Sequence, residues 1–174
     1  MDNILGLIRL RIKKGTNLVP CDSRTSDPYV LITMAQQTLK TAVVKDNCHP
    51  EWNEELTLFI QDKDLKTKTP IQLTVCDKDT FSVDDKMGEA DIDIKPYLQC
   101  VKMGLTDVPE GHVVKIVQPD RTNCLAEESR CIWRNGKLVQ EMSLRLRNVK
   151  SGEVFVEIEW IDVTDSKGLS EVEL

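Results

Sequence analysis

The sequence predicts an all-β protein, an eight-stranded antiparallel β-sandwich with a short helical and hairpin insertion before the last two strands. Two observations support this fold class. First, apolar and charged side chains alternate with a period of two, as where Ile8, Leu10 and Ile12 alternate with Arg9 and Arg11. Second, each such run is short and is bounded by Gly, Pro, Asn or Asp, which is typical of antiparallel strands with one buried face.

The alternation recurs along most of the chain and gives the strands in order. Apolar residues occupy every second position over 56–60, 71–75, 142–146 and 154–160. We expect strands at residues 5–13, 28–35, 38–46, 54–61, 71–76, 87–94, 139–147 and 153–161. About eight short strands separated by turns are typical of a β-sandwich.

The alternation stops between about residues 95 and 138, a stretch too long for a connection without structure of its own. Pro96 precedes an apolar pattern that indicates a short helix over 96–105. Residues 113–117 are a candidate strand, and 123–130 are a candidate helical turn. The dipeptide Asn135-Gly136 predicts a hairpin. This stretch is therefore expected to be a structured insertion on the sandwich.

Length and composition indicate one soluble domain over residues 1–165, followed by a polar, flexible tail over 166–174. The sequence contains no secretory signal and no apolar stretch near the ~20 residues that a transmembrane helix needs. Its six cysteines are scattered, without a CxxC pair. This spacing favours free thiols in a reducing compartment and argues against zinc.

The net charge of −6 bears on possible partners. An acidic protein is a poor nonspecific ligand for nucleic acid, so we expect no nucleic-acid partner. Anionic lipid also repels such a protein unless a basic face or a bound cation reverses the sign locally. Membrane contact is therefore expected to be conditional, as in a switch.

Aspartates cluster around two of the predicted turns. Asp77, Asp79 and Asp85 follow one strand, while Asp22 and Asp27 flank the turn before another. So much negative charge at one end of a sheet requires a positive partner. Oxygen ligands on flexible loops suit a hard cation, and Ca²⁺ fits best. Taken singly, each aspartate is also explained by the preference of Asp for turns.

The loop between Asp79 and Asp85 leaves two questions open. Asp84 competes with its neighbour Asp85 as the ligand. Phe81 and Val83 either enter a membrane interface from the loop tip or fold back onto the sandwich.

Four further cations are candidates for lipid contact. Arg24 and Lys86 either meet lipid phosphates or are solvated. Lys40 and Lys45 either form a basic groove with Lys13 and Lys14 or lie on a solvated sheet face.

Four sequence blocks together resemble the C2 domain. They are SDPYV at 26–30, NCHPEWNE at 47–54, VCDKD at 75–79 and DKMG at 85–88. Their order and spacing match the family, and the resemblance covers about residues 5–95 and the last two strands. Blocks in and after the insertion resemble the small plant C2-domain abscisic-acid-related proteins: NCLAEES at 123–129, GKLVQ at 136–140 and LRLR at 144–147.

This resemblance implies a non-enzymatic adaptor. Such proteins bind anionic phospholipid membranes in a Ca²⁺-dependent manner and recruit abscisic-acid receptors to the plasma membrane. The resemblance implies a peripheral location on the cytoplasmic face of the plasma membrane, together with cytoplasm and nucleus. Some members stimulate a YchF-type GTPase. As an alternative function, a GTPase-activating regulator would need an arginine that reaches the partner's site, and Arg121, Arg130 and Arg134 are candidates.

The resemblance also assigns calcium positions. It places Asp22 and Asp27 in the first loop, Asp77, Asp79 and Asp85 in the third loop, and backbone carbonyls of Cys21 and Lys78 in the same shell.

Two features depart from the wider C2 pattern. The gap between Asp22 and Asp27 is one residue shorter than in many protein-kinase-type C2 domains. Cys76 also stands where many C2 domains have an aromatic residue, which argues against an inositol-lipid site of that design.

Overall fold

The structure is a computed structural model that describes residues 4–19, 26–163 and 168–174. The strands are β1 (Ile4–Thr16), β2 (Pro28–Met34), β3 (Gln37–Lys40), β4 (Glu51–Gln61), β5 (Ile71–Asp77), β6 (Asp85–Ile92), β7 (Val113–Val117), β8 (Ser129–Arg134), β9 (Lys137–Arg145) and β10 (Glu153–Ile161). The helices are α1 (Asp62–Lys66), α2 (Lys95–Lys102) and a 3-10 helix, η1 (Leu169–Glu171).

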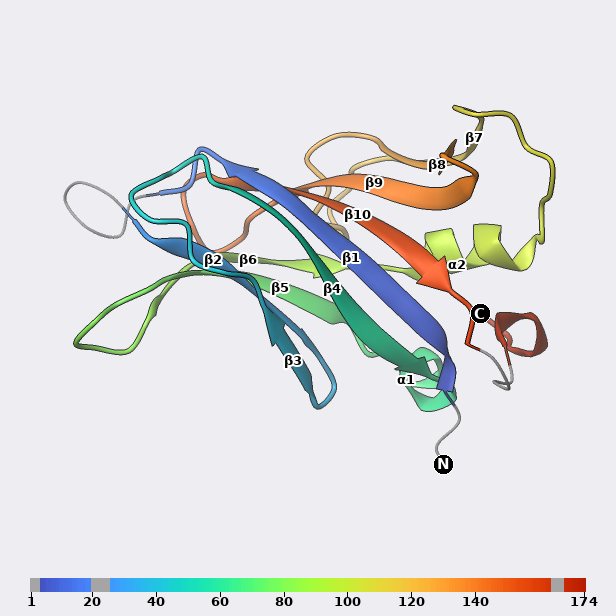
Figure 1. The fold of residues 1–174 in the computed structure, drawn as a ribbon, viewed down its shortest axis with the longest axis horizontal. Coiled ribbons are helices and arrows are strands. Elements are labelled where there is room, and N and C mark those ends of the chain that lie inside the picture. Colours follow the sequence, from blue (N-terminus) through green and yellow to red (C-terminus); the bar gives the residue numbers. More distant parts are fainter. Residues whose placement is uncertain (1–3, 20–25, 164–167) are drawn as a thin grey trace.

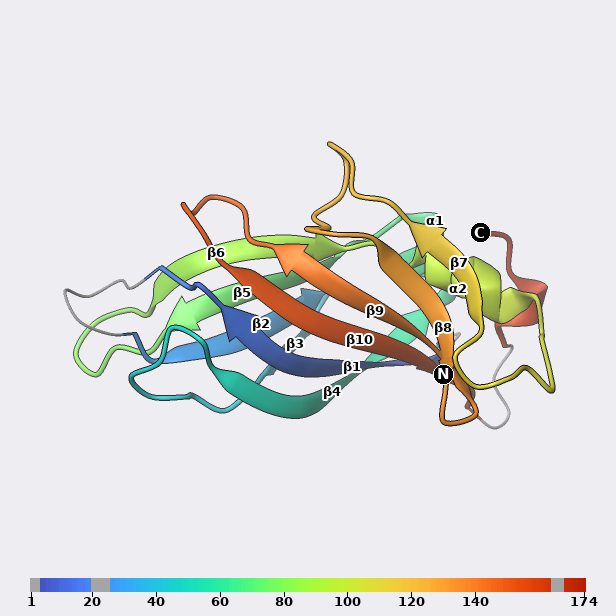
Figure 2. The same cartoon turned by 90° about the horizontal axis from the view of Figure 1, so that it is seen from above.

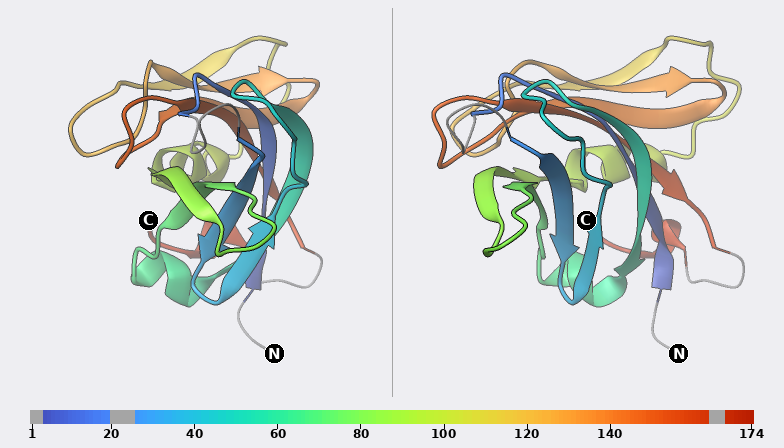
Figure 3. Two further views of the ribbon diagram at one scale, coloured as in Figure 1. Left: turned by 90° about the vertical axis from the view of Figure 1, so that its left-hand side faces the viewer. Right: turned by 60° about the vertical axis from the view of Figure 1, so that its left-hand side comes forward.

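Two antiparallel sheets form the sandwich. One has six strands in the order β4-β1-β10-β9-β8-β7, and the other has four in the order β3-β2-β5-β6. Figure 2 looks onto the larger sheet, and Figure 3 shows the two sheets as separate layers. Apolar residues at alternate positions of β1, β2, β5 and β10 fill the space between them. The predicted all-β sandwich is therefore confirmed.

The connections at one end of the sandwich are the loops that carry the aspartates. Figure 1 shows the segments between β3 and β4 and between β5 and β6 at the left, where β1 ends and β2 begins, with α1, α2 and η1 at the other end. The first aspartate loop joins the first two strands, β1 and β2. No helix among the described residues is long and apolar enough to span a membrane.

The insertion adds strands to the sandwich. Its predicted helix is present as α2, and its candidate strand is β7. The predicted hairpin joins β8 to β9, with positive φ angles of 53° at Asn135 and 75° at Gly136 that suit a two-residue turn.

The helical turn predicted over 123–130 is wrong. The amide of Ala126 donates to the Ser143 carbonyl at 2.8 Å, and the amide of Arg145 donates to the Cys124 carbonyl at 2.7 Å. These long-range hydrogen bonds to residues of β9 replace the local hydrogen bonds that a helix would need.

The strand predicted over 38–46 is shorter than expected and ends at Lys40. Beyond that point the side chain of Thr41 takes the place of a ladder carbonyl, because its hydroxyl accepts a hydrogen bond from the Val30 amide at 2.9 Å. A side-chain partner of this kind interrupts regular pairing.

The tail also differs from the flexible segment that we predicted. In its described part, residues 168–174, Leu169 and Val172 are buried and Leu174 packs against the core. The Lys102 ammonium donates a hydrogen bond to the Val172 carbonyl. The apolar side chains of this short polar segment therefore pack on α2 and on the surface around it.

Tyr97 of α2 ties the insertion to the sandwich. Its side chain is buried, and its hydroxyl donates to the Leu138 carbonyl at 2.7 Å. The same oxygen accepts from the Trp160 amide at 2.6 Å, so one hydroxyl bridges β9 and β10.

We expect Tyr97→Phe to destabilise the protein by roughly 1–3 kcal/mol, since two backbone groups lose their partner. Urea unfolding measures the loss. Tyr29→Phe is the matched control and should cost less, because the Tyr29 hydroxyl on β2 bonds one loop carboxylate, that of Asp84, and not two backbone groups. Equal midpoints for wild type and Tyr97→Phe would contradict the bridging role.

Candidate metal centre

Three carboxylates meet where β5 ends and β6 begins. Asp77 closes β5, Asp85 opens β6, and the two lie directly opposite each other in the ladder. Asp79 lies in the connecting loop, and one oxygen of each side chain lies within 4.8 Å of the others. Asp77 is buried, Asp79 is half-buried and Asp85 is exposed. Three like charges at this spacing repel one another, and a cation relieves the repulsion.

Asp27 is tied to this cluster through its backbone. Its amide donates to Asp77 Oδ1 at 2.8 Å, and its carbonyl accepts from the Lys78 amide at 3.0 Å. The carboxylate of Asp27 is not one of the three clustered groups; its Oδ1 accepts from the Asp46 amide at 2.9 Å. The first loop, the loop before β4 and the third loop are thus joined by hydrogen bonds around one point.

Three predicted positions lie outside the described residues: Cys21, Asp22 and Arg24. The candidate ligands that the structure brings together are therefore Asp77, Asp79 and Asp85, with Asp27 and the backbone of Lys78 beside them.

Asp84 has a different structural role from its neighbour Asp85, because its carboxylate is held by hydrogen bonds. Its Oδ2 accepts a hydrogen bond of 2.5 Å from the Tyr29 hydroxyl, and its Oδ1 accepts one of 2.9 Å from the Asp79 amide. The Lys78 ammonium lies 3.7 Å from the same carboxylate. Because both oxygens are engaged, Asp84 fixes the shape of the loop, which favours Asp85 as the ligand.

The hydrogen bond between Tyr29 and Asp84 also shifts both acidities. It lowers the pKa of Asp84, helped by the backbone amide of Asp79, and it raises the pKa of the Tyr29 hydroxyl. Sequence reasoning missed Tyr29. The only indication of Tyr29 in the sequence was the alternation, which places this residue on the outward face of β2, opposite Cys76 of β5.

The tip of the third loop projects two apolar side chains into solvent. Phe81 is 99% exposed and Val83 is 89% exposed, so the alternative that Phe81 folds back onto the sandwich is wrong. Lys86 is exposed on β6, where it pairs with Cys76. The exposed apolar tip thus lies on the same loop as the carboxylate cluster.

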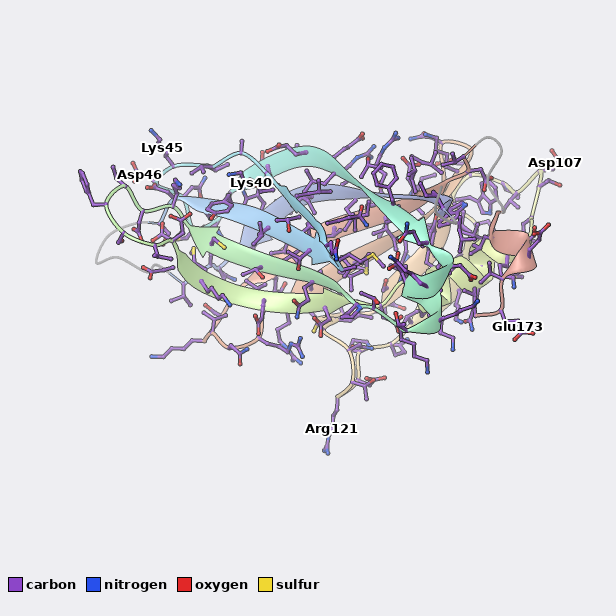
Figure 4. All side chains as sticks on the ribbon, turned by 90° about the horizontal axis from the view of Figure 1, so that it is seen from below. Lys40, Lys45, Asp46, Asp107, Arg121 and Glu173 are labelled. Carbon is purple, nitrogen blue, oxygen red and sulfur yellow. The ribbon has the colours of Figure 1, made fainter. Side chains whose placement is uncertain are left out.

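The four lysines of the predicted basic groove lie on different sheets. Lys40 closes β3 and Lys45 follows it in the next loop, and both are exposed (Figure 4). Lys13 lies 3.7 Å from Glu157, and Lys14 lies over the ring of Phe155 at 5.0 Å, so their partners belong to β10 of the other sheet. Of the two alternatives, the solvated face therefore fits Lys40 and Lys45 better than a groove shared with Lys13 and Lys14.

Comparison with known proteins gives a consistent family. The C2 domain model matches residues 6–108. Protein C2-DOMAIN ABA-RELATED 5 of Arabidopsis thaliana is 54% identical over 97% of this chain and 82% of its own length. GTPase activating protein 1 of Oryza sativa subsp. indica is 46% identical over 97% of this chain and 99% of its own.

Solved structures agree on the fold alone. The calcium-bound pair of C2 domains of Extended-Synaptotagmin 2 superposes with a TM-score of 0.64 at 17% identity, over 93% of this chain and 48% of that one. A single C2 domain of plant Extended Synaptotagmin 1 gives 0.60 at 19% identity, over 93% of this chain and 98% of that domain.

Removing the Tyr29 hydroxyl tests the loop anchor. In metal-free protein we expect Tyr29→Phe to raise the pKa of Asp84 toward the ordinary value of about 3.9. The lowered pKa of the folded state stabilises the protein above the unfolded pKa, and this contribution is lost as the pH falls through the folded pKa. The variant should therefore be less stable near neutral pH, and the difference should vanish in acid.

Carbon-13 NMR titration of the Asp84 carboxyl gives the pKa directly. Tyr97→Phe is the control, since that hydroxyl is remote from Asp84. An unchanged Asp84 pKa in Tyr29→Phe would show that the hydrogen bond does not stabilise the loop.

Proposed function

Because this chain belongs to the C2-domain family, and within it to the C2-domain ABA-related proteins, we propose that it is a non-enzymatic, calcium-dependent phospholipid-binding adaptor. Its partners on this proposal are an anionic phospholipid membrane and the abscisic-acid receptors that it recruits. Its sites of action are the cytoplasmic face of the plasma membrane, the cytoplasm and the nucleus.

One observation carries the proposal: the clustered carboxylates of Asp77, Asp79 and Asp85 lie at the base of the loop whose apolar tip is exposed. Ca²⁺ binds six to eight oxygens at relaxed geometry, so loop carboxylates leave coordination positions for lipid phosphate. Without the ion, the cluster repels anionic lipid. With the ion, the local charge changes sign and Phe81 can enter the headgroup region.

The adaptor role rests on the surfaces away from these loops. The insertion contributes α2 and the strands β7 and β8, which lie at one edge of the larger sheet. These elements are at the end of the molecule that points away from the aspartate loops in Figure 1. A membrane-bound domain would present this end to the cytoplasm, where a receptor is accessible. Names of relatives that contain "ABA-related" support this direction.

Replacing two clustered carboxylates tests the switch. We expect Asp79→Asn with Asp85→Asn to reduce co-sedimentation with phosphatidylserine vesicles in micromolar Ca²⁺ to the level seen in chelator. The physical reason is that two oxygen ligands lose their charge while the side-chain shape is kept. Asp107→Asn with Glu173→Gln is the matched control, because it removes the same charge at the opposite end of the molecule (Figure 4).

Two results would contradict the proposal. Wild-type binding that is equal in Ca²⁺ and in chelator would assign membrane contact to Phe81 and the exposed lysines instead. Equal loss in the control pair would reduce the effect to net charge.

A second candidate function is stimulation of a YchF-type GTPase, favoured by the relative named GTPase activating protein 1 and by the setting of one arginine. Arg130 lies 3.4 Å from Glu128 and Arg134 lies 3.3 Å from Glu141. Arg121 has no ion pair within the described ranges and projects from a turn into solvent (Figure 4). Of the three candidates, Arg121 is the one whose guanidinium is available to a partner's phosphates.

We expect Arg121→Ala to lower the stimulated rate of GTP turnover by at least about a hundredfold if this arginine acts in the partner's site. Arg121→Lys should not restore the rate, since an ammonium lacks the planar fork. Arg130→Ala is the control. Unchanged stimulation in the Arg121, Arg130 and Arg134 variants would eliminate the arginine mechanism.

A further inference from the structure

The end of the sandwich opposite the aspartate loops contains a cavity that the proposed function does not use. Its volume is about 450 Å³, and it opens between the turn after α1, the start of α2 and the loop that carries Asn123. Ligand pockets commonly span 300–1,000 Å³, so the volume is sufficient for a small molecule.

Aliphatic residues line the cavity, with Leu65 and Leu174 partly exposed and Ile92, Ile94 and Leu98 buried beneath them in the core. They come from four separate parts of the chain: Leu65 after the α1 start, Ile92 at the end of β6, Ile94 and Leu98 around the α2 start, and Leu174. Leu174 already places an isobutyl group against this surface and packs on the core. The cavity therefore fits an aliphatic group, whose transfer from water is favourable in proportion to the area covered.

The acidic side chains of the lining are all engaged elsewhere. Asp64 accepts from the Gln61 amide at 2.9 Å, within the capping box of α1. Asp93 accepts from the Lys95 amide at 3.0 Å. Asp91 pairs with Arg147 at 2.7 Å. Arg147 thus neutralises Asp91, whereas Asp64 and Asp93 each have one oxygen satisfied by a backbone amide.

The cations of the lining are in the opposite situation. Lys68 and Lys95 are exposed, and neither has an ion pair with any residue in the described parts of the chain. Both backbones are held firmly. Lys68 occupies the left-handed position after α1 with a φ of 54°, and its amide donates to the Leu65 carbonyl. Two lysines that line one cavity and have no ion pair among the described residues can together attract one anionic group.

We propose that this cavity binds an anionic amphiphile, a single carboxylate or phosphate on an aliphatic chain of about eight to twelve carbons. The anion pairs with Lys68 and Lys95, and the chain covers the aliphatic floor. Because the cavity and the aspartate loops lie at opposite ends (Figure 1), this binding requires neither calcium nor a membrane.

Calorimetric titration of the full chain in chelator tests the proposal with three probes below their micelle concentrations. Decanoate and decyl phosphate represent the two sources of the anion, and decyltrimethylammonium carries the wrong charge. We expect heat from at least one anionic probe and none from the cation. The anion that binds more tightly, decanoate or decyl phosphate, identifies the headgroup as a carboxylate or a phosphate.

Charge reversal at the mouth should remove the binding. We expect Lys68→Glu with Lys95→Glu to weaken the anionic probe by about tenfold or more. Lys40→Glu with Lys45→Glu is the matched control, since those lysines lie outside the cavity. Thr69→Trp fills the cavity mouth and should weaken the same probe without a change of charge.

Three results would overturn the proposal: no heat from either anion, equal binding of the cationic probe, or equal loss in the control pair. Phe81→Ser with Val83→Ser separates this site from the exposed loop. Loss of binding in that variant would place the amphiphile on the loop tip and would also overturn the proposal. The aspartate variants leave this assay unaffected, so a failed calcium switch and a failed cavity site give different results.

Discussion

Electrostatic repulsion between facing carboxylates is the constraint around which one end of this molecule is arranged. The β5–β6 register sets Asp77 opposite Asp85, an arrangement that costs free energy in an antiparallel pair. The neighbouring backbone offsets part of that cost, because the Asp27 amide points at Asp77. The other loops at this end of the sandwich are arranged around the same repulsion between carboxylates. Hydrogen bonds between protein groups alone join the loops of three connections to one another.

The two ends of the sandwich have different physical characters. At the aspartate end, polar hydrogen bonds between loops determine the shape, and apolar groups are left exposed. At the other end, buried aliphatic and aromatic side chains join α2 and the C-terminal segment to the larger sheet, with the Tyr97 hydroxyl satisfying two backbone groups. The insertion is thus part of the core rather than an appendage, and its strands β7 and β8 extend the sheet.

The sequence was informative where local pattern decides structure. Period-two alternation identified eight of the ten strands, although it made β3 too long, and Asn135-Gly136 identified a turn that needs two positive φ angles. It failed where a distant partner decides. The segment around Ala126 pairs with the chain near Ser143, and the Thr41 hydroxyl accepts a hydrogen bond from the Val30 amide. Local propensity carries no information about such partners.

The candidate site divides in the same way. The clustering of Asp77, Asp79 and Asp85 followed from their place next to one strand end. The division of labour between Asp84 and Asp85 did not, because it depends on Tyr29, more than fifty residues earlier in the chain. Likewise, nothing in the alternation separated Lys13 and Lys14 from Lys40, since a period of two assigns a face within a sheet and not the sheet itself.

The anchoring of the third loop by Asp84 has a kinetic consequence. Since the Tyr29 hydroxyl and the Asp79 amide already hold Asp84, the loop does not have to fold when a cation arrives. Capture can then proceed at a rate limited by diffusion and by ion dehydration, and differences in affinity among variants of this loop would appear mainly in how long the ion stays. On the proposed function, a loop of this kind would respond quickly to a rising ion concentration, and the lifetime of the bound state would set the duration of the response.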